Sequence, residues 1–137
     1  MPNGDWTAQQ IQIPIIAWHG GFEIMKQTGC NIVGGVAHSI YDLDWWTQLA
    51  QTAQQYKIGI MPWAGQALEK FLDEPGWKIR PEWETFLSNL GGEPSLYGFY
   101  AWEEPNVLRQ LGGWGGCDMT EIYETIKRLA PKAKVTG

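Results

Sequence analysis

Cysteines and basic side chains are scarce in this chain of 137 residues. Its two cysteines, Cys30 and Cys117, lie far apart and lack the spacing of a metal site, so we expect two buried or free thiols. Ten Lys and Arg residues against fifteen Asp and Glu residues give a net charge of -5. This acidic balance disfavours nucleic acid or an anionic membrane as a partner and suits a neutral or polar ligand.

Long apolar runs and recognisable nucleotide motifs are also missing. No stretch approaches the roughly 20 apolar residues that a membrane span needs, and residues 1–6 (MPNGDW) lack the basic and apolar regions of a signal peptide. Residues 17–22 (AWHGGF), after the first expected strand, match neither the Gly-x-Gly-x-x-Gly fingerprint nor the P-loop. This counts against a nucleotide-binding domain, and we expect no cofactor.

Tryptophan, in contrast, is abundant, with nine in the chain. Because indole is bulky and partly polar, some of the nine are expected at a surface or in a cleft, where a flat aromatic face suits the apolar face of a sugar ring. For any single tryptophan, a place in an aromatic core is an equally good interpretation.

The hydrophobic pattern alternates between short apolar runs and amphipathic stretches. Glycine, proline and acidic residues mark the ends of these stretches, as in Asp42 or Asp44 before the longest helix and Pro81 at the start of another. We expect strands at 11–18, 31–37, 58–63, 96–102 and 134–136. Helices are expected at 22–28, from 42 or 44 to about 57, 81–90 and 119–130, with one or two helical turns at 66–72.

This order predicts a single α/β domain over residues 1–137 with parallel strands covered by helices. Right-handed crossovers allow an open doubly wound sheet or a closed eightfold barrel. A complete barrel needs about 250 residues. The chain supplies about four and a half βα repeats, and so we expect a partial, half TIM barrel.

Ligands of parallel α/β folds bind beyond the carboxyl ends of the strands. The expected strand ends carry Trp18 and His19, His38, Trp63, and Trp102 with Glu103 and Glu104. The two histidines can bind ligand hydroxyls or, with a carboxylate, a metal ion, although two histidines on neighbouring strands are a weak metal signal and we expect no metal. Structural roles for these residues remain open.

Glu104 is the candidate proton donor. A carboxyl group beside an indole and away from bulk water has its pKa raised, which suits general acid catalysis near neutral pH. Alternation along the strand places Tyr100, Trp102 and Glu104 on one side and Glu103 on the other. Glu103 and Glu104 are equally compatible with a solvated loop after the strand.

Residues 97–106 (YGFYAWEEPN) resemble the fourth-strand motif of glycoside hydrolase-like (β/α)8 barrels, which ends in Asn-Glu-Pro or, in a related group, Asp-Glu-Pro-Asn. Residues 14–18 (PIIAW) and 25–33 (MKQTGCNIV) also resemble the opening of that group. The resemblance implies that Glu104 is the general acid/base. It also implies that Glu103 and Asn106 contact the substrate, with Glu103 standing where the family has Asn or Asp.

A retaining enzyme of this clan needs a second carboxylate about 5 Å from the first, and the resemblance places it on a seventh strand that these residues do not supply. Two strand edges are also left unpaired. The expected partners are therefore an oligosaccharide or glycoside and either a second copy of the chain or a C-terminal half barrel. The alternatives are a non-catalytic carbohydrate-binding or assembly domain and a small α/β domain in which residues 102–105 are structural.

Overall fold

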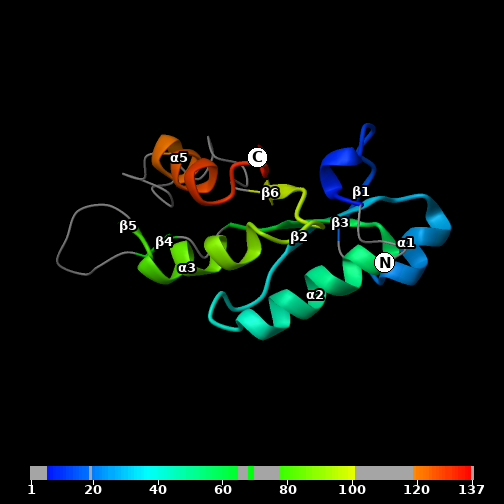
Figure 1. Cartoon of the computed structure of the whole chain (residues 1–137), viewed down its shortest axis with the longest axis horizontal. Helices are drawn as coiled ribbons and strands as arrows, with labels where there is room; N and C mark the ends of the chain where they lie inside the picture. Colours follow the sequence, from blue (N-terminus) through cyan, green and yellow to red (C-terminus); the bar gives the residue numbers. More distant parts are fainter. Residues whose placement is uncertain (1–5, 19, 65–67, 70–77, 101–118, 137) are drawn as a thin grey trace, which may run out of the picture.

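The chain folds into a mixed α/β structure with parallel strands, seen in a computed structural model that describes residues 6–18, 20–64, 68–69, 78–100 and 119–136 (Figure 1). In chain order the elements are η1 (Ala8–Gln10), β1 (Ile16–Trp18), α1 (Phe22–Thr28), β2 (Ile32–Val36), α2 (Leu43–Tyr56), β3 (Gly59–Pro62), β4 (Leu68–Glu69), β5 (Lys78–Ile79), α3 (Pro81–Leu90), β6 (Gly98–Tyr100), α5 (Met119–Leu129) and β7 (Lys134–Thr136).

The parallel strands lie side by side in the order in which they occur along the chain. β1, β2 and β3 form a three-stranded sheet, and β6 pairs with β7. Isolated parallel bridges, Ile60 to Leu96 and Trp63 to Tyr100, connect β3 with the segment that contains β6. The spatial order is therefore β1-β2-β3-β6-β7, and the small antiparallel pair of β4 and β5 stands apart from it.

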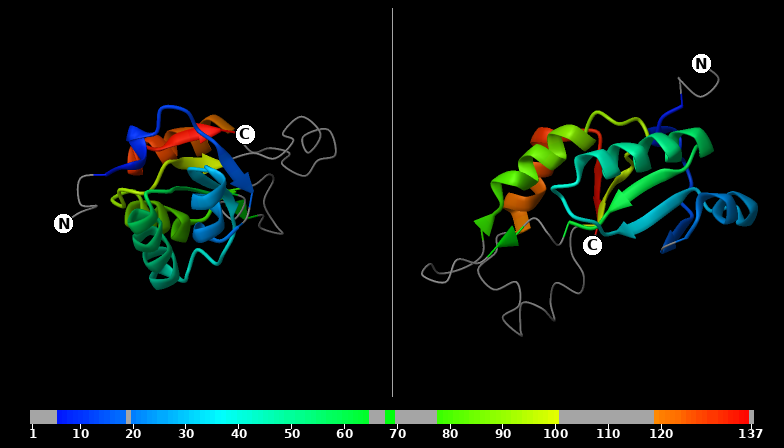
Figure 2. Two further views of the ribbon diagram at one scale, coloured as in Figure 1. Left: turned by 90° about the vertical axis from the view of Figure 1, so that its right-hand side faces the viewer. Right: turned by 90° about the horizontal axis from the view of Figure 1, so that it is seen from below.

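The helices also contact one another in chain order: α1 with α2, α2 with α3, and α3 with α5. In the right-hand view of Figure 2, α2 lies along β3. The main hydrophobic core lies between this helical layer and the sheet. There Phe86 of α3 contacts Trp46 of α2 edge to face at 5.0 Å and Phe99 of β6 at 6.3 Å between ring centroids.

A second, smaller core covers the opposite face of the sheet near the amino ends of the strands. It joins Ala8 of η1 to Ile32, Met61 and Tyr97. The backbone N–H of Ala8 donates to Pro94 O at 2.8 Å, and Gln9 Nε2 donates to Leu96 O at 3.0 Å. The segment around η1 is thus held against the start of β6 and closes the amino end of this face.

The four helices predicted at 22–28, from 42 or 44 to about 57, at 81–90 and at 119–130 are confirmed where the structure describes them, because their end signals act locally. Gly29 ends α1 with a φ of 82°, a left-handed conformation that glycine adopts without strain. Asp42 rather than Asp44 caps α2, and its carboxylate accepts the N–H of Trp45. Pro81 occupies the first turn of α3.

Two predictions of local structure were wrong. The first strand is shorter than residues 11–18, because the Asn31 side chain replaces ladder bonds there: its Oδ1 accepts the N–H of Ile15 and its Nδ2 donates to Ile13 O. Residues 68–69 form a strand paired with β5 instead of a helical turn. The predicted strand end at 101–102 lies outside the described residues.

Two register shifts occur near the carboxyl ends of the central strands. Between Gly34 and Val36, β2 has an extra residue opposite β3 and Gly35 adopts a φ of 68°. Between the two bridges, three steps along β3, from Ile60 to Trp63, face four steps in the other strand, from Leu96 to Tyr100. Bulges of this kind frequently turn side chains toward a functional site.

Candidate functional site

The carboxyl ends of the parallel strands gather three of the predicted site residues. Trp18 is the last residue of β1, Trp63 directly follows β3, and His38 lies two residues beyond β2. Tyr100, which ends β6, joins them. The other predicted site residues lie outside the described part of the chain: His19, Trp102, Glu103, Glu104 and Asn106.

The Trp18 ring packs closely against two glycines of β2, Gly34 and Gly35. A Cβ atom at Gly34 would lie 2.9 Å from Trp18 Cζ3 and 2.8 Å from Ile16 Cγ2, and one at Gly35 would lie 2.9 Å from Trp18 Cε3. Any larger residue at these positions would therefore push the indole away. The atoms nearest to both glycines are therefore side-chain atoms of β1 and not another backbone.

The indole of Trp18 is 52% exposed although it is held on two sides. The Tyr100 ring meets it at a centroid distance of 5.1 Å and an angle of 67°, an edge-to-face contact that fixes its orientation. The result is a large aromatic surface that is both oriented and open to solvent. Large side chains held in this way commonly serve as contact surfaces for ligands.

Trp63 lies next to Tyr100 through the backbone, since the two residues form a parallel bridge and Ala64 N–H donates to Tyr100 O at 2.9 Å. Its indole Nε1 is buried, and no residue in the described ranges accepts its hydrogen bond. A buried donor without an acceptor is costly. Trp63 therefore holds an unused N–H group beside the strand ends.

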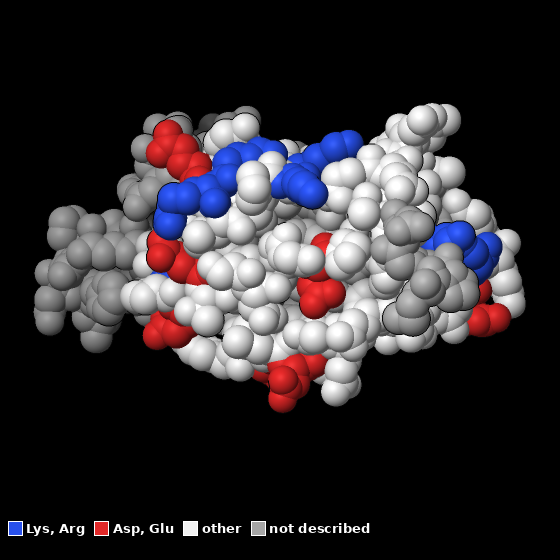
Figure 3. Space-filling model, in the orientation of Figure 1, with Lys and Arg blue, Asp and Glu red and all other residues white. Residues whose placement is uncertain are grey.

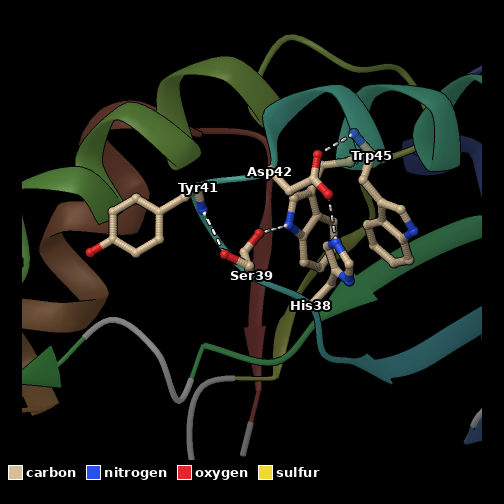
Figure 4. Close-up of polar contacts among 6 residues, drawn as sticks. His38, Ser39, Tyr41, Asp42 and Trp45 are labelled. Atoms are coloured by element: carbon tan, nitrogen blue, oxygen red, sulfur yellow. Dashed lines mark hydrogen bonds and ion pairs between the residues drawn. The ribbon is translucent and has the colours of Figure 1, made fainter.

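His38 faces the start of α2 (Figure 4). Its ring stacks on Trp45 at a centroid distance of 3.8 Å and an angle of 18°, and its Nε2 lies 2.9 Å from Asp42 Oδ2. The Trp46 indole donates to Ser39 O at 3.0 Å, which anchors the same loop to the helix. The Asp42 contact takes up Nε2 of the imidazole, and the other ring nitrogen, Nδ1, makes no hydrogen bond with a residue of the described ranges. His38 is thus oriented by α2 and not by Trp18.

The Asp42 carboxylate has its pKa lowered from the ordinary value of 3.8, mainly by the hydrogen bond with His38 and then by the backbone N–H of Trp45. Both contacts favour the charged form of the carboxylate. A negative charge at the N-terminus of α2 is also favoured by the helix dipole. The hydrogen bond between His38 and Asp42 therefore connects the loop beyond β2 to the start of α2.

Positive charge is concentrated over the last helix and the last strand. In Figure 3, Lys and Arg side chains gather over α5 and the C-terminal strand. This part of the sequence contains Lys127, Arg128, Lys132 and Lys134. Arg128 pairs with Glu84 of α3 at 2.8 Å, and Lys134 Nζ lies 4.8 Å from the Tyr97 ring centroid. These contacts give the basic residues structural roles within the fold.

Within the described ranges, no group of three His, Cys, Asp or Glu side chains is arranged to hold a metal ion. Cys30 is a half-buried free thiol. The helices of these ranges include none with the length and apolarity needed to cross a bilayer. Comparisons with protein-family models, curated proteins and solved structures find no match to the chain.

Tyr100 and the glycine pair are the site features that sequence reasoning missed. The pair was visible as Gly34-Gly35 in an otherwise apolar strand, a pattern that indicates a bulge or a close approach. Its partner, however, comes from the neighbouring strand. Only the register between β1 and β2, which places Trp18 opposite Gly34, brings the indole and the glycine pair together.

Proposed function

We propose that the chain is a glycoside hydrolase-like half barrel that binds carbohydrate on the aromatic surface at its strand ends. The observation that carries the proposal is the position of Trp18. Its indole packs against Gly34 and Gly35, contacts the Tyr100 ring edge to face, and is about half exposed to solvent. The axial C–H groups of a sugar ring form a flat apolar face with slight positive charge. That face complements the negative face of an indole ring.

Polar groups on residues at the neighbouring strand ends favour a hydroxylated ligand over a purely apolar one. The buried Trp63 Nε1 offers an unused donor. His38 is fixed at the next strand end by Asp42 and Trp45, which leaves Nδ1 available to a ligand hydroxyl. The net charge of -5 is unfavourable for anionic ligands. A neutral oligosaccharide fits these properties.

The half-barrel part of the proposal rests on the order of the elements. In a doubly wound sheet the strand order reverses and helices cover both faces. Here the order β1-β2-β3-β6-β7 follows the chain without reversal, and successive helices contact one another. A barrel segment has this arrangement, with a smaller core on its inner face. The cluster of Ala8, Ile32, Met61 and Tyr97 is consistent with such an inner layer.

Hydrolysis is the second candidate function, favoured by the resemblance of residues 97–106 to a catalytic fourth strand. Tyr100 faces Trp18, and strand alternation from Tyr100 predicts Trp102 and Glu104 on the same side. On this proposal Glu104 is the general acid/base. The nucleophile would have to come from outside these 137 residues.

Titration with neutral oligosaccharides, followed by tryptophan fluorescence, tests the binding proposal. We expect a saturable change for at least one β- or α-linked glucan, mannan or xylan oligomer. Absence of any change across such a panel, confirmed by calorimetry, would contradict carbohydrate binding.

Glu104→Gln separates binding from hydrolysis, with Glu82→Gln, at an exposed carboxylate in the first turn of α3, as the matched control. If the chain hydrolyses a glycoside, Glu104→Gln should reduce the rate at least about a hundredfold, as removal of a general acid does, while the sugar still binds. Turnover that survives Glu104→Gln would exclude the catalytic role. Binding without turnover in the wild-type protein would leave the carbohydrate-binding function alone.

A further inference from the structure

His38 lies at the rim formed by the carboxyl ends of the parallel strands. It comes two residues after β2, the strand between β1 and β3. Trp63 N–H donates to Val36 O at 2.8 Å, and so the loop that carries His38 leaves the sheet beside Trp63. The His38 side chain is 33% exposed. The imidazole is thus open to a ligand that is bound at the strand ends.

The start of α2 holds this imidazole in one orientation (Figure 4). The ring stacks on Trp45 at a centroid distance of 3.8 Å and meets Trp46 edge to face at 6.4 Å. Its Nε2 atom lies 2.9 Å from Asp42 Oδ2. Three contacts from one helix therefore fix the ring, and none of them is a hydrogen bond to Nδ1.

Asp42 determines which nitrogen of the neutral imidazole carries the hydrogen atom. The pKa of Asp42 is lowered from its ordinary value of 3.8, mainly by the hydrogen bond with His38, so the carboxylate is ionised near neutral pH and can only accept hydrogen bonds. Nε2 must then be the protonated nitrogen and donate to Oδ2. Nδ1 is left with a lone pair and is a hydrogen-bond acceptor.

We propose that His38, held by Asp42 as the Nε2–H tautomer, is the hydrogen-bond acceptor that orients a ligand hydroxyl at the strand ends. This role rests on the proposed carbohydrate-binding function and adds the direction of one polar contact to it. Such an acceptor selects ligands that carry a donor group, such as a sugar hydroxyl or an acetamido N–H. It disfavours ionised carboxylates and sulfate esters, which only accept. Asp42 touches no ligand and acts as a positioning residue.

A metal ion is the other species that commonly binds a histidine lone pair backed by a carboxylate. In the part of the chain that the structure describes, however, no three His, Cys, Asp or Glu side chains are grouped to hold one. The second carboxylate oxygen, Asp42 Oδ1, already accepts the Trp45 N–H at 3.2 Å. A hydroxyl donor therefore fits Nδ1 of His38 better than a metal ion does.

Nitrogen NMR of isotope-labelled histidine side chains in the full chain tests the tautomer. Nδ1 of neutral His38 should show the shift of an unprotonated nitrogen, in a signal assigned by its loss in His38→Phe. Asp42→Asn should invert the tautomer, because Oδ1 remains the acceptor of the Trp45 N–H and the amide NH2 then faces Nε2. A protonated Nδ1 in the wild-type chain would overturn the proposal. So would an Asp42→Asn variant that keeps the wild-type tautomer.

The contact itself is tested with the glucan, mannan or xylan oligomer that changes the tryptophan fluorescence most. On addition of this oligomer, the Nδ1 signal of His38 should move toward that of a hydrogen-bonded nitrogen. His38→Phe, which keeps a ring against Trp45, should weaken binding roughly three- to tenfold in calorimetry. The control is Tyr41→Ala in the same loop, which should bind like the wild type.

Two results separate this proposal from carbohydrate binding as such. If the oligomer binds but His38→Phe has unchanged affinity, or the Nδ1 signal does not move, the role of His38 is overturned while carbohydrate binding stands. If no oligomer of the panel binds, both proposals fail.

Discussion

At the scale of single residues, the orientation of Trp18 depends on what its neighbours lack. Gly34 and Gly35 provide no side chain where the indole lies, and Tyr100 supplies the one ring of the described residues that packs against it. The aromatic surface is therefore built by a bulge in β2 and a register between three strands. Changes at the glycines should alter ligand binding without touching a ligand.

Gly35→Ala should destabilise the fold and displace Trp18. A φ of 68° costs a residue with a Cβ roughly 1–2 kcal/mol, and the new atom would meet Trp18 Cε3. Gly92→Ala is the control, because a Cβ there has no atom within 4 Å and no strained φ. Urea unfolding should show a loss of about 1–2 kcal/mol or more at Gly35 and under about 0.5 kcal/mol at Gly92. Equal losses of unfolding free energy in the two variants would contradict the close packing of Trp18 against Gly35.

Asp42→Asn should lower stability in a pH-dependent manner. Because the folded pKa of Asp42 lies below its ordinary value of 3.8, its charge stabilises the fold above that pH, and the effect is lost as the pH falls through the folded pKa. Thermal unfolding of both proteins from neutral to acid pH measures this. In a His38→Ala background the difference should shrink. A difference that grows toward acid pH would be inconsistent with the pair.

The helix caps could be predicted from the sequence, because Asp42, Gly29 and Pro81 act on backbone groups a few residues away. The Trp18 site could be predicted only in part. Trp18 and Trp63 follow from their positions at strand ends, but the contact between Trp18 and Tyr100 joins residues 82 positions apart. The stacking of His38 on Trp45 likewise depends on how the loop beyond β2 folds back on α2.

At the scale of elements, aromatic packing joins the helical layer to the sheet. Phe86 connects α2 and β6 through its contacts with Trp46 and Phe99. Ser95 Oγ donates to Ala50 O at 2.7 Å and ties the segment before β6 to α2. These contacts set the position of β6, and with it Tyr100, relative to the first three strands.

Phe86→Ala should therefore cost about 3–5 kcal/mol, the usual loss when a buried aromatic ring leaves a cavity. Phe86 is 1% exposed. Tyr41→Ala, at an exposed position, should change stability by under about 0.5 kcal/mol. Chemical denaturation monitored by circular dichroism measures both values. If Phe86→Ala lowers stability as little as Tyr41→Ala, the contacts of Phe86 with Trp46 and Phe99 do not hold α3 to the sheet.

The alternation of elements was visible in the hydrophobic pattern, since the described helices and the parallel strands occur where expected. The pair of β4 and β5 was not predicted. Strands of two residues are too short for a periodic signal, and their pairing joins residues that are 9 and 11 positions apart. The length of the first strand was overestimated. Its apolar run does not reveal that the Asn31 side chain takes the backbone hydrogen bonds of Ile13 and Ile15 that a strand ladder would otherwise use.

At the scale of the whole molecule, parallel pairing and the sequential order of strands follow from the short crossovers through helices. In the described part of the chain, the outer sides of β1 and β7 pair with no strand. The candidate ligand surface lies at the carboxyl ends of the strands, where the Trp18 and Tyr100 rings are in contact.

Isothermal titration calorimetry of the wild-type chain and Trp18→Ala, with an oligosaccharide that the fluorescence titration identifies, tests the central claim most directly. We predict that Trp18→Ala weakens binding about tenfold or more, equivalent to roughly 1.4 kcal/mol. Trp18→Phe, which keeps a smaller flat ring, should lose less, and Tyr41→Ala should bind like the wild type. Equal affinity of the wild-type chain and Trp18→Ala would contradict the proposal that this indole is the carbohydrate-binding surface.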